Sequence, residues 1–220
     1  AASPATLTSR SDLPATRGGR SAAALLFALL LAVSPIPSAH AQSEPLAGQA
    51  ITAGPDGYVH IASGFRFPLQ LAQVKAVGER VFEASNVMVR YGSEGPESKG
   101  AWFALYVYPP RAPLDDEAAE VGQTILERYG AQPAPPPRPL PRIASDGRAQ
   151  WYSATIENRP SRTGYIIVRR GGWSMKVRAT VPNDTGDAEL QRILDGIAAV
   201  PWDWAPAKTP DEAEKVVAFK

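Results

Sequence analysis

The chain has 220 residues, a formal net charge of +1 and no cysteine. The absence of cysteine excludes disulfides, thiolate metal ligands and cysteine nucleophiles. A charge near zero argues against a nucleic-acid partner, because nucleic-acid-binding domains usually carry a basic excess, and the length suffices for one domain with a sizeable core.

Residues 1–41 have the layout of a secretory signal peptide. Three arginines precede an apolar run over residues 22–33, and prolines and the triplet Ala39-His40-Ala41 follow it. A basic segment, a short apolar segment and small residues before the cleavage site are the three parts of such a signal. The apolar run is shorter than the roughly 20 residues that a membrane span needs. We therefore predict an exported protein, periplasmic or secreted, with no stable membrane span after cleavage.

The first part of the remaining chain contains short strand patterns. Residues 42–56 are small and polar, and we expect a flexible lead-in. A short strand is predicted over 57–62, and an edge segment over 64–69, because Pro68 cannot donate a ladder hydrogen bond. Residues 80–91 predict a strand pair or a bent strand, with a break at Ser85-Asn86.

The middle of the chain combines a buried strand with a helix. Residues 101–108 are apolar on both faces, which predicts a central strand with something packed over each face. Over 114–129, apolar residues recur at helical spacing, acids occupy the first turn and Gly130 follows the end. The tract 131–141 contains six prolines. We expect it to be a stiff polyproline crossover rather than a ligand for another protein.

The clearest local pattern is a β-hairpin centred on Gly171-Gly172. Two glycines accept the positive φ angles of a type I′ turn, and strands over 163–170 and 173–181 flank them. This turn fixes the register, so that an apolar face is buried and a mixed face carries Arg169, Lys176 and Arg178. With a further strand over 149–157, the three strands should form an antiparallel meander.

The C-terminal part predicts a second helix and a closing segment. Asp184 or Thr185 is the expected N-cap of a helix whose apolar stripe includes Leu190 and Ile197. Residues 205–220 are expected to form a tail or a short helix with a capping box. The order of elements predicts a single α+β domain over 57–204, an antiparallel β-sheet flanked by helices.

The search for catalytic or metal-binding residues identifies no convincing set. His60 is the one histidine beyond residue 41, and no serine lies in a nucleophile-elbow pattern. The acids Asp115, Asp116 and Glu117 begin a helix, where carboxylates stabilise the exposed amides. We therefore assign no catalytic residue, no metal ligand and no cofactor.

Two surface features are candidate binding sites. Arg169, Lys176 and Arg178 could bind an anion, although they could also form a solvated sheet face. Trp202 and Trp204 could anchor a protein partner in the cell envelope, although tryptophans after a helix commonly seal a sheet edge.

Three stretches resemble one family. They are GFRFPLQL (64–71), AWFALYVYPP (101–110) followed by a helix, and YIIVRRGGWSMKVRATV (165–181) with its terminal helix. In their pattern and order the chain resembles the exported relatives of the PsbP and Mog1 proteins, including the DcrB-like bacterial domains. The resemblance implies an antiparallel sheet flanked by helices and a non-enzymatic accessory, assembly or binding role. It assigns no site residues.

The leading hypothesis is thus an exported, non-catalytic binding or accessory domain. One alternative is a small periplasmic hydrolase or lyase that uses His60 and dispersed carboxylates. Another is a carrier of an apolar ligand, which would require a cavity lined by residues such as Phe103, Leu105 and Ile125.

Overall fold

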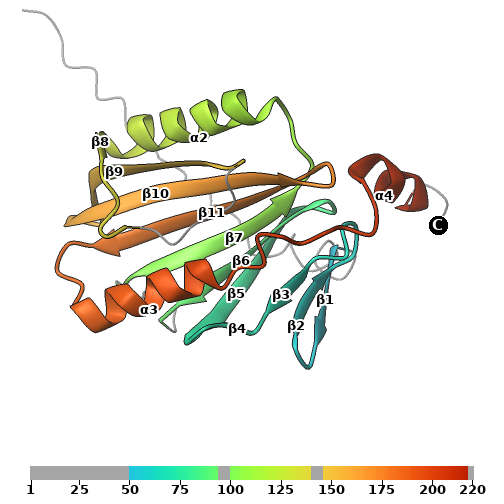
Figure 1. The fold of residues 1–220 in the computed structure, drawn as a ribbon, viewed down its shortest axis with the longest axis horizontal. Helices are drawn as coiled ribbons and strands as arrows, with labels where there is room; N and C mark the ends of the chain where they lie inside the picture. Colours follow the sequence, from blue (N-terminus) through green and yellow to red (C-terminus); the bar gives the residue numbers. More distant parts are fainter. Residues whose placement is uncertain (1–49, 94–99, 140–145, 218–220) are drawn as a thin grey trace, which may run out of the picture. The chain divides into compact units, whose positions relative to one another are not determined.

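The structure is a computed structural model that describes residues 50–93, 100–139 and 146–217, with side chains up to Glu214 in the last range (Figure 1). The predicted signal peptide and residues 42–49 of the predicted lead-in lie outside these ranges. The last residues of the proline-rich tract, Leu140 and Pro141, lie outside them as well.

An eight-stranded antiparallel sheet forms the centre of the fold, which confirms the predicted α+β class (Figure 1). The pairing between neighbours is antiparallel throughout. The strands in spatial order are β4 (Gln70–Leu71), β5 (Val74–Glu83), β6 (Asn86–Gly92), β7 (Trp102–Tyr108), β11 (Trp173–Pro182), β10 (Arg159–Arg170), β9 (Arg148–Ile156) and β8 (Gln132–Ala134).

The predicted hairpin has the expected register. Arg170 pairs with Trp173 and Tyr165 with Arg178 across the β10–β11 ladder. Gly171 and Gly172 have φ angles of +52° and +86°, the left-handed conformations that a two-residue turn requires. The alternation along both strands therefore places every second side chain on the same face.

A second, three-stranded sheet corrects the expected boundary of the lead-in. Its strands are β1 (Ile51–Gly54), β2 (Gly57–His60) and β3 (Arg66–Pro68). β1 pairs with β2 in antiparallel fashion, so the residues from 51 to 54 are not a flexible lead-in. The composition concealed this strand, because only Ala50 and Ile51 of this segment are buried and the rest of β1 is exposed.

Two helices cover opposite faces of the large sheet. Helix α2 (Leu114–Tyr129) packs on β9 and β10, and helix α3 (Asp187–Ala198) packs on β4, β5 and β7 (Figure 1). Helix α2 ends, as predicted, at Gly130 in the left-handed conformation. The residue that caps α3 is Gly186, without a side-chain cap. The predicted cap Asp184 instead pairs with Arg159 at 2.5 Å.

The C-terminal segment packs back on the hairpin. Helix α4 (Pro210–Val217) begins with the expected capping box, in which the Glu212 carboxylate accepts from the backbone N–H of Thr209 at 2.8 Å. The indole N–H of Trp173 donates to the Lys208 carbonyl at 2.8 Å. The predicted tail or short helix is therefore a helix.

The proline-rich tract enters the large sheet at its edge. Its residues Gln132–Ala134 form β8 and pair with β9 only. Pro133 is tolerated there because an edge strand does not need every N–H. The tract is thus excluded from the sheet centre, as its composition requires.

The central strand β7 is covered by a helix on one face only. Phe103 and Leu105 are fully buried on the α3 side. On the other face Trp102 and Tyr106 are half-buried, because α2 follows β9 and β10. The expectation that an element packs over each face of 101–108 is therefore only half met. The uncovered part of this face is where the candidate site lies.

Candidate functional site

Two adjoining cavities lie between α2 and the uncovered part of the sheet. Their volumes are about 480 Å³ and 320 Å³, and they share the lining residues Tyr106, Thr124, Lys176 and Arg178. We call them together the basic groove. The larger cavity is also lined by Arg80, Arg90, Trp102, Arg128, Tyr129 and Arg159.

The strand register explains why these cations gather. Arg178 of β11 lies opposite Ala104 of β7, and Ala104 lies opposite Arg90 of β6. One step along, Lys176 lies opposite Tyr106. Since alternate residues of a strand share a face, three neighbouring strands place their basic and aromatic side chains on the same uncovered surface.

The cations of the groove lie on aromatic rings. The Arg90 guanidinium carbon is 4.7 Å from the centre of the Trp102 ring. The Lys176 ammonium nitrogen is 4.7 Å from the Tyr106 ring and 5.0 Å from the Tyr108 ring. Such contacts stabilise a cation without neutralising it. The groove therefore keeps its net positive charge.

Glu117, Glu120 and Glu157 also line the groove, but they form no ion pair with its central cations. Among the residues that the structure describes, no acidic side chain forms an ion pair with Arg80, Arg90, Arg128, Lys176 or Arg178. The Nε atoms of Arg90 and Arg178 are buried, and neither has a hydrogen-bond partner in that part of the chain. Buried donors of this kind are uncommon in folded proteins.

Burial and mutual repulsion change the acidity of the central cations. Burial, and then the neighbouring charge of Arg178, lower the pKa of Lys176 from 10.5 to about 8. Burial also lowers the pKa of Arg178, although the nearby Tyr129 and Tyr106 oppose the shift. A lysine whose pKa is lowered in a cleft is a recognised mark of a functional site.

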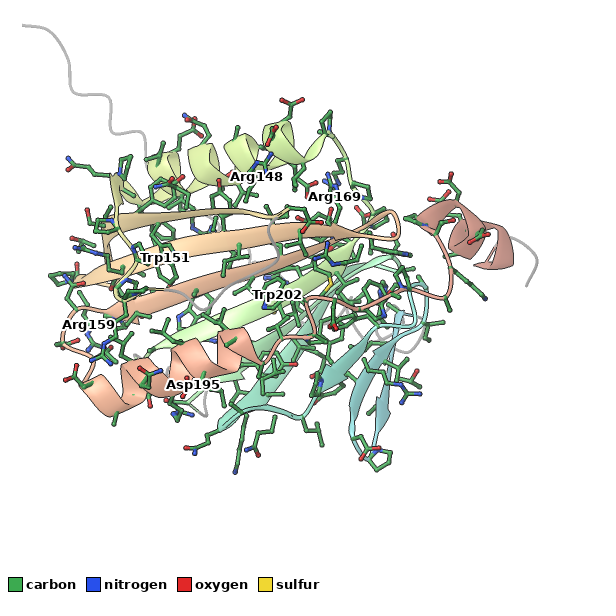
Figure 2. All side chains as sticks on the ribbon, in the orientation of Figure 1. Arg148, Trp151, Arg159, Arg169, Asp195 and Trp202 are labelled. Atoms are coloured by element: carbon green, nitrogen blue, oxygen red, sulfur yellow. The ribbon has the colours of Figure 1, made fainter. Side chains whose placement is uncertain are left out.

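Arg169, predicted as a binding residue, is committed to a structural contact instead. Its guanidinium lies 2.5 Å from the carboxylate of Glu117 and donates to the Ala112 carbonyl at 2.6 Å (Figure 2). The Ser174 hydroxyl donates to the same carboxylate at 3.2 Å. The structure thus brings Lys176 and Arg178 together in the groove and ties Arg169 to the first turn of α2.

The two tryptophans lie on the other face of the sheet. Trp202 belongs to the core beneath α3, and its indole N–H donates to the Ile197 carbonyl at 3.0 Å (Figure 2). Trp204 meets Phe65 edge to face, with ring centres 5.0 Å apart. These contacts are those of residues that close a core, and neither tryptophan lies in the basic groove.

His60 is sealed inside the protein. It is 0% exposed, its Nδ1 lies 2.7 Å from the Ser63 hydroxyl, and its Nε2 donates to the Ala84 carbonyl at 3.3 Å. The Ser63 oxygen also accepts from the backbone N–H of Phe65 at 3.1 Å. Ser63 is itself only 1% exposed. This serine–histidine pair organises a turn, and neither residue lines the basic groove.

The sequence analysis missed Arg80, Arg90 and Arg128. No local sequence pattern marks any of these arginines as a groove residue. Pairing between strands, or packing of α2, brings each of them to the groove. The alternation of Met88 and Arg90 in β6 shows that these residues share a face. It does not show that Lys176 and Arg178 lie on the same surface two strands away.

Neither a search for other functional features nor comparison with known proteins identifies the protein. Along the described ranges, no three histidine, aspartate or glutamate side chains lie close enough to hold a metal ion. No helix there combines the length and apolar composition needed to cross a membrane. No family model matches the chain, and no curated protein matches it. The fold and the groove define an antiparallel α+β domain with a cationic, aromatic-floored cleft.

Proposed function

We propose that this protein is an exported, non-catalytic binding domain whose basic groove takes an anionic ligand. The observation that carries the proposal is the group of five groove cations for which the described residues provide no ion pair. Export rests on the layout of residues 1–41, and an accessory role beside a partner in the cell envelope follows from the same expectation.

Partial burial makes this group of cations more than an ordinary basic surface. Lys176 and Arg178 are half-buried on β11, and burial disfavours the charged form of both side chains. Positive charge in such a place is unfavourable unless it is paired. An anionic ligand would offset both the cost of burying these charges and their mutual repulsion, which favours binding over a purely structural role.

The hydrolase alternative has less support. His60 and Ser63 are both buried, and no carboxylate hydrogen-bonds to the imidazole within the described chain. Burial lowers the pKa of His60 to about 4, far from the value that suits a general base near neutral pH. A general base also has to reach the proton that it removes.

The apolar-carrier alternative also has less support. Phe103 and Leu105 belong to the core on the α3 side of the sheet. Ile125 belongs to the separate cluster beneath α2. Residues on opposite faces of one sheet do not enclose a common cavity.

The test is calorimetric titration of the full 220-residue chain with phosphate, citrate and glucuronate, and with neutral glycerol. We expect saturable binding of an anion and none of glycerol. The double substitution Lys176→Met and Arg178→Gln should weaken the affinity by about tenfold or more, since each hydrogen bond to a charged group is worth ~1.5–3 kcal/mol.

Arg148→Gln is the matched control. Arg148 lies outside the two cavities and pairs with Asp115 at 2.5 Å on the surface (Figure 2). The control should bind as tightly as the unaltered chain. If no anion binds, or if the double variant binds equally well, the proposed function is wrong.

A further inference from the structure

We propose that Arg90 and Arg178 form a two-sided clamp for the phosphate group of a phosphate ester. The clamp closes over Ala104, the residue that separates the two arginines in the sheet. This inference rests on the proposed function, which requires only that the groove binds an anion, and it names the chemical class of that anion.

The sheet register sets the spacing of the clamp. Arg178, Ala104 and Arg90 occupy one row across β11, β7 and β6. Adjacent strands lie ~4.8 Å apart, so the two arginine backbones are roughly 10 Å apart. Two long side chains on this spacing can reach one anion between them. Ala104, between them, has a small side chain and is only 1% exposed, so the anion would lie above it, between the arginine side chains.

The orientation of each arginine leaves donors for a ligand. Arg90 lies over the Trp102 ring at 4.7 Å, a contact that uses the face of the guanidinium and none of its N–H groups. Arg178 makes one long side-chain hydrogen bond, at 3.4 Å from its Nη2 to the Thr163 hydroxyl. The buried Nε of each arginine has no partner among the described residues. Because both Nε atoms are buried, a ligand would use the terminal N–H groups of the two guanidinium groups.

The density of charge favours a phosphate over a single carboxylate. Besides burial, the charge of Arg178 lowers the pKa of Lys176, and the charge of Arg128 lowers the pKa of Arg178. A carboxylate brings one negative charge to this cluster, and a phosphate monoester brings nearly two at neutral pH. The guanidinium fork also matches phosphate oxygens in a bidentate manner.

The volume of the groove indicates an ester rather than free phosphate. The larger cavity holds about 480 Å³. A water molecule occupies ~30 Å³ of liquid, and a phosphate group is only a few times larger. Space therefore remains for an organic substituent beside Tyr129 and the Thr180 and Ser161 end of the cavity.

The experiment compares glycerol 3-phosphate with glycerate, its carboxylate counterpart, by calorimetric titration of the full chain at neutral pH. We expect glycerol 3-phosphate to bind at least tenfold more tightly. Arg90→Gln and Arg178→Gln should each weaken its binding by about 10- to 100-fold. Arg90→Lys keeps the charge without the fork, and it should recover only part of the loss.

Arg148→Gln, which lies outside both cavities, is the control and should bind as tightly as the unaltered chain. Arg80→Gln serves as a comparison within the larger cavity, because it removes a groove cation other than the two arginines of the clamp. Arg80 pairs across from Met88 and so lies outside the Arg178–Ala104–Arg90 row. It should cost no more than about threefold, as expected for a peripheral charge. Thermal midpoints without ligand show whether each variant is folded. If Arg90→Gln does not fold, Arg90→Lys replaces it in the test.

The outcomes separate the two proposals. If no anion binds at all, the proposed function fails and the clamp fails with it. If glycerate binds as tightly as glycerol 3-phosphate, or if Arg80→Gln costs as much as Arg90→Gln, the clamp is refuted and anion binding stands. Vesicles with and without phosphatidic acid show where the phosphate group comes from. Binding to the phosphatidic-acid vesicles that depends on Arg90 and Arg178 identifies a lipid headgroup. Binding of the soluble ester alone identifies a free phosphate ester. Either source supports the clamp.

Discussion

Acidification should destabilise this protein through His60. The imidazole is fully buried, donates through Nε2 to the Ala84 carbonyl and therefore accepts from the Ser63 hydroxyl at Nδ1. Its edge also contacts the Trp173 ring, with ring centres 5.5 Å apart. This arrangement fits the neutral ring. Burial lowers the pKa of His60 from 6.5 to about 4, and the backbone hydrogen bond to Ala84 opposes the shift.

The magnitude follows from proton linkage. Because the pKa is lower in the folded state, the unfolded chain binds a proton first as the pH falls below 6.5. The stabilisation is thus complete above pH 6.5 and is lost as the pH falls toward 4. With these two pKa values, the free energy of unfolding should decrease by about 2 kcal/mol between about pH 7.5 and about pH 5.

The assay is urea unfolding followed by tryptophan fluorescence at these two pH values and constant ionic strength. His60→Gln provides the control, because it cannot titrate and keeps a donor for the Ala84 carbonyl. Its loss of ring packing lowers stability equally at both pH values. The unaltered chain should lose about 2 kcal/mol more than the variant on acidification. Parallel losses in the two proteins would refute the reasoning.

Two further predictions concern the groove and its supporting contacts. The affinity for sulfate, an anion that does not titrate in this range, should fall as the pH rises from about 7 to about 9, because Lys176 loses its charge near its pKa of about 8. Calorimetry on the Lys176→Met variant should show weaker binding that does not depend on pH. Parallel pH profiles for the two proteins would contradict this prediction. Glu117→Gln should lower the free energy of unfolding by about 3 kcal/mol, because it leaves Arg169 without its buried partner. Asp115→Asn, which breaks the exposed pair with Arg148, should cost less than about 1 kcal/mol in the same urea assay. Equal losses would show that burial of the Arg169–Glu117 pair is unimportant.

Local patterns predicted much of the fold. The paired glycines fixed the register of β10 and β11, and helical spacing with a following glycine located α2. These features depend on residues that are close in sequence, where geometry and sterics act directly. β1 was missed because Ile51 is the only one of its four residues that is buried. The cap of α3 was misplaced because Asp184 is used in a contact with a distant strand.

The candidate site was only partly predictable. The hairpin register was enough to place Lys176 and Arg178 on one face, and it grouped Arg169 with them. Nothing local indicated that Glu117 of α2 would form an ion pair with Arg169 on that face. Glu117 was interpreted only as a first-turn acid that stabilises the exposed helix amides, whereas its side chain is 6% exposed and forms an ion pair. A long-range ion pair changed the role of both residues.

The sequence by itself determined the antiparallel α+β class, the hairpin register and the polarity of its two faces, because each follows from periodicity and turn chemistry within a few residues. Only the tertiary structure decided which basic residues become a groove. The order of β6, β7 and β11 places Arg90 and Arg178 in one row, and α2 packs mainly on β9 and β10. Both are outcomes of non-local packing, which joins residues far apart in the chain and which no local pattern encodes.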